Sequence, residues 1–303
     1  MKKRLLIGII IMTMILPYVN AGIIDFFKDI FESPGQTEQT DVSVTVGNSP
    51  PAITNVQAIS NIALIPGTTT NVVFNFSASD ANGISTLVDT TTTARFTKTG
   101  EPERGSGNNC INVGDVGNQR TYQCTVTMQF YDAPGTWSVN VSVKDNSAPA
   151  GYGENITTTA IVSIGYDILL SITSFSFPSV SPGTSPNAVS TQNTTITNKG
   201  NSEDPLNANL TLRAFNLSGT TNSNEYIPAT SFRAVGRAQA VNVCAAGTVL
   251  DDEVDVNILS AVLSRGASST EEFVYCLATV PSISSQTYST TGAGSQRWLI
   301  SIG

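Results

Sequence analysis

The stretch at residues 122–143 constrains the fold most strongly, because apolar and polar residues alternate along it with a period of two. The alternation stops at residues 132–135, which read Asp-Ala-Pro-Gly, and resumes after them. This pattern is typical of two antiparallel strands that are joined by a turn and share one buried face. The residues expected on that face are Tyr122, Cys124, Val126, Met128, Phe130, Trp137, Val139, Val141 and Val143.

Similar alternating segments fill the first half of the chain, with no convincing helix between them. Only 13% of the residues are charged, and the polar remainder is mostly Ser, Thr, Asn and Gly, which favours strands and turns. Six or seven such strands predict an antiparallel β-sandwich over residues 50–165. The strands are expected at residues 52–59, 71–79, 87–98, 121–130, 136–143 and 156–164, with a loop at residues 100–118. In the last strand the residues expected to be buried are Ile156, Thr158, Ala160, Val162 and Ile164.

A second all-β region is expected over residues 166–303, because 303 residues are enough for two domains that each bury a core. Its strands are predicted at residues 167–177, 190–198, 207–215, 254–263, 273–280 and 297–302, with loops at residues 181–189 and 218–224. The second tryptophan, Trp298, falls on a core position, as Trp137 does. The predicted fold class is therefore all-β, with two tandem sandwich domains.

Residues 1–21 have the features of a secretory signal peptide, namely a basic start, an apolar run and a small residue at Ala21. We expect cleavage after Ala21, and an uncleaved membrane anchor is the alternative. No second apolar stretch is long enough to span a membrane. The mature protein is therefore expected to have no integral membrane span and to be secreted, outside the cell or at its surface.

Between the leader and the first domain, residues 22–49 contain an alternating segment at residues 41–46. A short amphipathic segment at residues 23–31 and a polar linker at residues 32–40 precede it. A strand at residues 41–46 either pairs at the edge of its own sheet or pairs with a neighbouring copy of the protein. The residues on its apolar side are Val42, Val44 and Val46.

The charge and the absence of histidine exclude several classes of function. Without the three basic residues of the leader, 12 basic residues face 23 acidic ones, so the mature net charge is about −11. This charge disfavours binding to nucleic acid or to anionic membranes. The absence of histidine excludes histidine-dependent triads and zinc hydrolase sites. We therefore expect no catalytic residues and no enzymatic activity, and only carboxylate chemistry is still open.

The four cysteines fall two to a domain, which in an exported protein predicts the disulfides Cys110–Cys124 and Cys244–Cys276. Each disulfide would contribute about 3 kcal/mol by restricting the unfolded chain. A redox or metal pair is the alternative, but the spacing is not CxxC and the chain has no histidine partner.

Six Asn-X-Ser/Thr sequons make the chain a candidate glycoprotein. Three of the acceptors, Asn75, Asn140 and Asn209, are expected to point outward from their strands. The alternative is that a sequence rich in Ser, Thr and Asn contains such triplets by chance. The six acceptors are Asn75, Asn140, Asn155, Asn193, Asn209 and Asn216.

Asp80, Asn82 and Asp145 lie at expected strand ends and are candidate ligands of Ca²⁺, the one cofactor that the sequence suggests. The same residue types are common in turns, which is the competing interpretation. An acidic cluster, expected to be a solvated surface, is formed by Asp251, Asp252, Glu253 and Asp255.

Two parts of the chain resemble known families. The sequences FNFSASDANG (74–83), YQC (122–124) and YDAPGTWSVNVSVKDN (131–146) are similar to immunoglobulin-like, PKD-like modules of archaeal surface proteins. The sequence TITNKGN (195–201) resembles the strand and turn of CARDB-like cell-adhesion modules. These resemblances imply two immunoglobulin-like domains. The Tyr122-x-Cys124 pair also resembles a tyrosine corner, but no cysteine lies on an early strand, so the usual inter-sheet disulfide is not expected.

Together these features predict a secreted, non-catalytic structural or adhesion glycoprotein of the cell surface. Its expected partners are other cell-surface proteins or copies of itself, with glycans as a further class and no nucleic acid. Two alternatives stay open. One is a subunit of an extracellular filament assembled by exchange of the strand at residues 41–46, and the other is a secreted carbohydrate-binding or carbohydrate-active protein.

Overall fold

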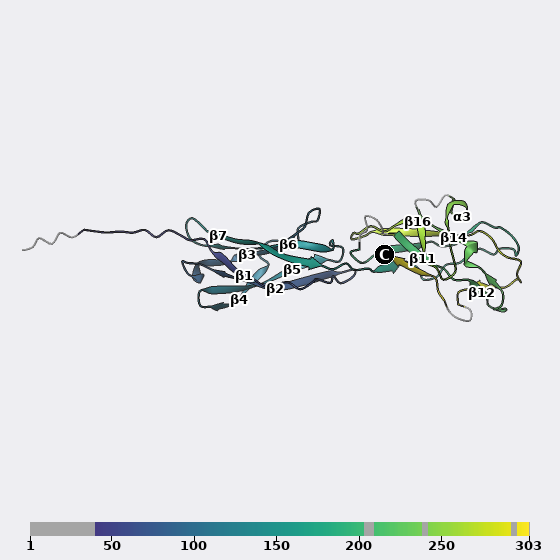
Figure 1. Ribbon diagram of the computed structural model, residues 1–303, viewed down its shortest axis with the longest axis horizontal. Helices are drawn as coiled ribbons and strands as arrows, with labels where there is room; N and C mark the ends of the chain where they lie inside the picture. Colours follow the sequence, from purple (N-terminus) through teal and green to yellow (C-terminus); the bar gives the residue numbers. More distant parts are fainter. Residues whose placement is uncertain (1–39, 203–208, 238–241, 292–295, 303) are drawn as a thin grey trace, which may run out of the picture. The chain divides into compact units, whose positions relative to one another are not determined.

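The computed structural model of the chain describes residues 40–202, 209–237, 242–291 and 296–302 (Figure 1). By its internal contacts the chain divides into Met1–Gly47 and Asn48–Gly303, and the described strands all lie in the second unit. The fold is all-β, as predicted, and the strand pairs of its sheets are antiparallel. The signal peptide and the amphipathic segment expected at residues 1–21 and 23–31 lie outside the described residues.

The first seven strands form two sheets whose buried residues make one core (Figure 1). The strand order is β1-β2-β5-β4 in one sheet and β3-β6-β7 in the other. The pairing of β2 with β5 runs from Thr69 opposite Gln129 to Ser79 opposite Gln119. The elements are β1 (Ala52–Val56), β2 (Thr69–Ser79), the 3-10 turn η2 (Ile84–Thr86), β3 (Leu87–Thr97), β4 (Cys110–Val116), β5 (Gln119–Gln129), β6 (Gly135–Asp145) and β7 (Tyr152–Val162).

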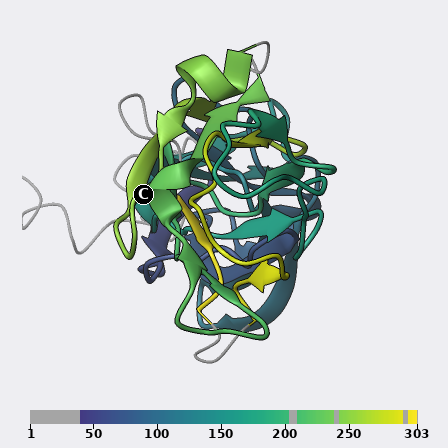
Figure 2. The ribbon, with the colours of Figure 1, turned by 90° about the vertical axis from the view of Figure 1, so that its right-hand side faces the viewer.

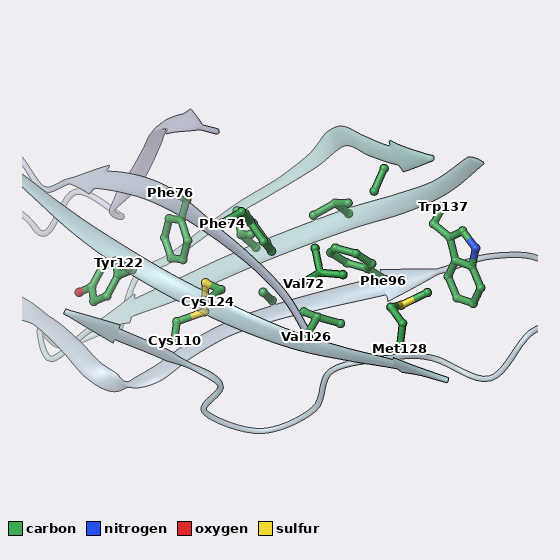
Figure 3. Packing of buried hydrophobic residues seen from close by; sticks show 14 of the residues in the cluster. Val72, Phe74, Phe76, Phe96, Cys110, Tyr122, Cys124, Val126, Met128 and Trp137 are labelled. Carbon is green, nitrogen blue, oxygen red and sulfur yellow. A yellow bond between two sulfur atoms is a disulfide. The ribbon is translucent and has the colours of Figure 1, made fainter. Parts of the chain in front are cut away.

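The core of strands β1–β7 consists largely of the faces that the alternation predicted. All nine residues expected to be buried at residues 122–143 are buried. Figure 3 shows Trp137 at one end of the cluster and Tyr122 toward the other, with Phe74, Phe76 and Phe96 between them. Trp137 is fully buried, and its Nε1 donates a hydrogen bond to the carbonyl oxygen of Ala133 at 2.9 Å. Burial of the indole therefore leaves no unpaired donor.

Residues 100–118 are not simply the predicted loop, because Cys110–Val116 forms the edge strand β4. Every residue of β4 after Cys110 is exposed, so the strand lacks the alternation that marks one buried face. Its place in the sheet comes from pairing with β5, where Cys110 lies directly opposite Cys124.

Strand β7 differs from the prediction in which side chains it buries. Ala160 and Val162 are buried as expected, but Ile156 and Ile164 are exposed. The register between β6 and β7 shifts just after Val139, which is a β-bulge. Extra residues in one strand move the side chains on the far side of the bulge to the opposite face, so Ile156 leaves the core. Ile164 lies beyond the end of the strand.

The remaining strands form three sheets around a second core. Their orders are β15-β14-β17-β10-β8, with β9 also paired to β17, then β16-β11-β19 and β13-β12-β18. Figure 2 shows these strands, coloured from teal to yellow, with the short helix α3 in green at the top. The elements are β8 (Ile168–Leu170), β9 (Ala188–Val189), β10 (Thr194–Asn198), β11 (Asn209–Arg213), β12 (Leu217–Gly219), β13 (Tyr226–Ile227), η3 (Ala229–Ser231), β14 (Phe232–Gly236), α3 (Val243–Ala246), β15 (Thr248–Val249), β16 (Val256–Val262), β17 (Thr270–Leu277), β18 (Tyr288–Ser289) and β19 (Leu299–Ile302).

The strand predicted at residues 167–177 is mostly irregular, and only Ile168–Leu170 forms β8. Phe175 and Phe177 nevertheless pack against the second core. The ring of Phe175 stacks on that of Tyr275, with the centroids 4.1 Å apart and the planes 5° from parallel. Aromatic packing therefore holds a segment whose apolar residues suggested a strand.

Polar contacts join the two groups of strands within Asn48–Gly303. The Nδ2 atom of Asn201 donates to the carbonyl oxygens of Asp132 at 3.1 Å and Ser163 at 3.0 Å. Arg265 forms an ion pair with Glu101, with Nη2 2.6 Å from Oε1. These bonds connect residues whose pairing no local pattern in the sequence indicates.

Residues 41–46, which were predicted to form a strand, form none in the structure, and residues 40–51 as a whole have no secondary structure. Val42, Val44 and Val46 are 84%, 81% and 85% exposed. A β-strand requires a neighbour that accepts and donates its backbone hydrogen bonds. In the described part of the chain these six residues, the arm, pair with no such neighbour.

Candidate functional site

The residues that follow the arm, Asn48 and Ser49, are held by distant parts of the chain. Asn48 Nδ2 donates to Asp145 Oδ2 at 2.9 Å and to the carbonyl oxygen of Pro149 at 3.0 Å. The backbone N–H of Ser49 donates to Asn82 Oδ1 at 2.9 Å. Two of the three candidate Ca²⁺ ligands, Asp145 and Asn82, therefore bind the residues that directly follow the arm.

Asp145 is buried, and both of its carboxylate oxygens accept hydrogen bonds. Its Oδ1 accepts from the backbone of Gly151 at 2.7 Å and of Ser147 at 3.1 Å. The hydrogen bond from Asn48, followed by those from Gly151 and Ser147, holds the pKa of Asp145 below its ordinary value, because each stabilises the charged form. In this structure Asp145 acts as a structural acceptor.

Asp80 is the second buried carboxylate among the Ca²⁺ candidates. Its Oδ1 accepts from the backbone of Asn82 at 2.7 Å, a side-chain turn typical of Asp. Its Oδ2, like Asn48 Oδ1, is buried without a hydrogen-bond partner. Within the described residues, no group of three or more Asp, Glu, Cys or His side chains is placed to hold a metal ion. Hydrogen bonds thus join Asp80 to Asn82, Asn82 to Ser49 and Asp145 to Asn48. Binding of Ca²⁺ by these residues stays a prediction.

The structure contains the disulfides Cys110–Cys124 and Cys244–Cys276, with Cα–Cα distances of 4.0 and 5.2 Å. The first joins neighbouring strands of one sheet, β4 and β5, at directly opposite positions. The second ties the four-residue helix α3 to β17. The first disulfide therefore attaches an edge strand whose other residues are exposed, and the second attaches a helix of only four residues.

The six sequon acceptors are all partly buried, including the three that were expected to point outward. The Nδ2 atom, which would carry a glycan, donates to a carboxylate in three of them: Asn140 to Glu154, Asn193 to Glu272 and Asn216 to Asp252. In Asn155 only Oδ1 is engaged, as acceptor from the backbone and the hydroxyl of Thr157 at 3.0 and 3.1 Å. The amide nitrogen of Asn155 is thus more available than those of Asn140, Asn193 and Asn216.

The acidic cluster at residues 251–255 is exposed, as predicted. Asp255 forms an ion pair with Arg213 on β11. Asp252 accepts from the backbone N–H of Asn216 at 3.0 Å. These contacts connect the exposed loop at residues 251–255 to Arg213 on β11 and to Asn216.

Two sets of ionic contacts among residues 52–162, which include strands β1–β7 and their loops, were not predicted from the sequence. Arg104 and Asp132 form a doubly hydrogen-bonded pair in which the Asp132 side chain is fully buried. Tyr122 donates from its hydroxyl to Asp89 Oδ1 at 2.9 Å, and Arg120 donates to the same oxygen at 3.0 Å. Burial, together with the bond to Asp89, raises the pKa of Tyr122. The partner of the Tyr122 hydroxyl is a carboxylate on β3, whereas a tyrosine corner would use a backbone group.

The described residues include no helix long and apolar enough to span a membrane. No model of a known protein family matches the chain, and no curated protein matches it at a significant level. The features that bear on function are therefore those of the chain itself, above all the exposed arm and its hydrogen-bonded base.

Proposed function

We propose that this chain is a secreted, non-catalytic structural glycoprotein of the cell surface, built from two immunoglobulin-like β-sandwiches. The sheet orders β1-β2-β5-β4 and β3-β6-β7 support the first sandwich, because they correspond to the ABED and CFG sheets of a constant-type immunoglobulin domain. The second core, shared by the sheets of strands β8–β19, supports the other sandwich. Two disulfides in a chain with a signal-like leader support export, since disulfides persist mainly in oxidising compartments.

The structural role that the geometry supports best is assembly with copies of itself through the arm. The single observation that carries this proposal is the exposure of Val42, Val44 and Val46 in a segment that pairs with no strand of the described residues. Burial of a valine side chain is worth about 1.5 kcal/mol or more, and β-pairing would also satisfy the backbone groups. Donor and acceptor are different surfaces, so the contact is head-to-tail and extends into a filament.

Replacement of all three arm valines by aspartate tests this role. We expect the secreted parent protein to form filaments visible by negative-stain microscopy and concentration-dependent species in sedimentation velocity. The variant should remain folded by circular dichroism and sediment as a monomer. Val73→Asp is the matched control, because Val73 is 54% exposed on β2 and should tolerate the charge without loss of assembly.

Two results would contradict the proposal. One is a parent protein that stays monomeric at every concentration reached. The other is a triple variant that assembles as the parent does.

A further inference from the structure

Strand β4 is an edge strand with an unusual surface. It pairs on one side with β5 and ends the order β1-β2-β5-β4, so no strand of the described residues pairs with its other side. Ile111, Val113 and Val116 on this strand are 64%, 49% and 79% exposed. Exposed apolar edge strands are templates for pairing with another chain, and proteins usually protect them with charge, proline or a covering segment.

The register of β4 places its apolar residues on one face. Ile111 lies opposite Gln123 and Val116 opposite Gln119, both on the outer face of the sheet. Between them the register shifts by one residue at residues 112–114, so Val113 and Gly114 together occupy one position of the ladder. The outer face of β4 therefore presents three successive apolar positions, at Ile111, at Val113 with Gly114, and at Val116.

The inner face of β4 is polar beyond the disulfide. Its inward positions after Cys110 are Asn112, opposite Tyr122, and Asp115, opposite Arg120. The alternation along β4 is thus apolar on the outer face and polar on the inner face, over five ladder positions. A strand that pairs with β4 needs the same alternation in order to match both faces.

The arm has this pattern. Val42, Val44 and Val46 occupy alternate positions, with Ser43 and Thr45 between them. In an antiparallel pairing Val46 faces Ile111, Val44 faces the bulged position and Val42 faces Val116. Thr45 and Ser43 then face Asn112 and Asp115, so hydroxyl groups meet an amide and a carboxylate. A shift by one residue would place the valines beside these polar groups, which fixes the register.

Other edges with exposed apolar residues suit a donated strand less well. Part of the free edge of β7 is already used, because Ile62 N–H donates to Ile161 O and Ser163 N–H donates to Ile62 O, both at 2.8 Å. Its remaining length contains the bulge next to Asn155. On β16, Ser260 has a φ of 58°, which interrupts the extended conformation that pairing requires.

We propose that β4 of one copy is the acceptor for the arm of a second copy, paired antiparallel in the register just described. This inference rests on the proposed assembly through the arm and names the surface that receives it. The disulfide Cys110–Cys124 and the pairing with β5 hold β4 in place before the arm arrives. One added strand covers less area than a stable interface of about 1,200 Å² or more, so each link is reversible and depends on concentration.

Disulfide cross-linking between two single-cysteine variants tests the acceptor. The four native cysteines are all in disulfides, so an introduced cysteine is the only free thiol of each variant. Directly opposite residues in an antiparallel pair have Cα atoms about 4.5–5.5 Å apart, which suits a disulfide. We expect full-length Val44→Cys, mixed with a differently tagged Val113→Cys and oxidised mildly, to give a covalent heterodimer. The matched control is Ile161→Cys on β7, where Ile161 is 46% exposed.

Heterodimer yield with Val113→Cys at least ten-fold above that with Ile161→Cys supports the acceptor. Equal yields, or a higher yield with Ile161→Cys, overturn it while arm-dependent assembly still stands. The absence of cross-links in a parent that also fails to assemble removes both proposals. A chain carrying both Val44→Cys and Val113→Cys that closes an internal disulfide at high dilution shows that the arm pairs within its own molecule, which also overturns the inference.

Discussion

Replacement of Arg104 by methionine would leave a buried carboxylate without its counter-ion. The guanidinium Nε of Arg104 donates to both oxygens of Asp132 at 2.9 Å, and Nη2 lies 2.5 Å from Oδ1. The Asp132 side chain has no exposed surface, and its Oδ2 also accepts from the backbone N–H of Gln129 at 2.8 Å. Methionine fills a similar volume, so the main effect of the change is electrostatic.

Loss of one partner of a buried ion pair costs about 3–5 kcal/mol, because the remaining charge stays desolvated. This is a large part of a typical free energy of unfolding of about 5–15 kcal/mol. Arg95 offers an internal control. Its ion pair with Glu103 is 3.6 Å long and both side chains are more than 40% exposed, so Arg95→Met should cost less than about 1 kcal/mol.

Urea unfolding of the two variants and the parent, followed by tryptophan fluorescence and circular dichroism, measures the difference. Trp137 is a suitable probe because its indole donates to Ala133, the neighbour of Asp132. The variant Arg104→Met/Asp132→Asn should recover part of the loss, since the uncompensated charge is gone. A free energy of unfolding for Arg104→Met equal to that of Arg95→Met would refute the reasoning.

Two further predictions concern single side chains. We expect glycopeptide mass spectrometry of the secreted protein to find higher occupancy at Asn155 than at Asn216, whose Nδ2 binds Asp252 at 2.5 Å, and the reverse order would contradict this. Asn48→Ala should raise the pKa of Asp145 toward its ordinary value of about 3.9, measured by NMR titration of the carboxyl carbon. A lowered pKa in the folded state stabilises the fold at pH values above the unfolded pKa, and this stabilisation is lost as the pH falls through the folded pKa. The variant should therefore lose part of the stability that the parent has above the unfolded pKa. An unchanged pKa would show that Asn48 does not hold the pKa of Asp145 down.

The strands whose two faces differ in environment were predictable from local pattern alone. Val72, Phe74 and Phe76 on β2, and Trp137, Val139 and Val141 on β6, are buried at the positions that the alternation assigned. A period of two is visible in the sequence because each of these strands lies between a core and solvent. The all-β class followed from several such segments together.

Elements without that asymmetry were missed or misplaced. Strand β4 is exposed on both faces after Cys110, and its bulge interrupts the period of two in the sequence, so no regular alternation marked it as a strand. The bulge in β7 reversed the expected burial of Ile156, because one irregular pairing changes the face of every side chain beyond it. At residues 167–177 the apolar residues serve aromatic packing, with Phe175 against Tyr275, and the backbone is not extended along a neighbour.

Hydrogen bonds between side chains and distant segments also could not be predicted from the sequence. The side chain of Asn109 binds the backbone of Ala94 on β3: its Oδ1 accepts from Ala94 N–H at 2.7 Å, and its Nδ2 donates to Ala94 O at 2.8 Å. The bond between Asn48 and Asp145 spans 97 positions. Residue type shows what such groups can donate or accept, but their partners depend on how the sheets pack.

The sequence by itself therefore determined the strand class, most buried faces, the cysteine pairs and the alternating valines of the arm. Only the tertiary structure decided that the valines have no neighbour in the described chain and that β4 has an open apolar edge. The physical reason is that alternation is a property of one segment, whereas pairing requires two. Whether a strand finds its partner is set by which edges the rest of the fold leaves open.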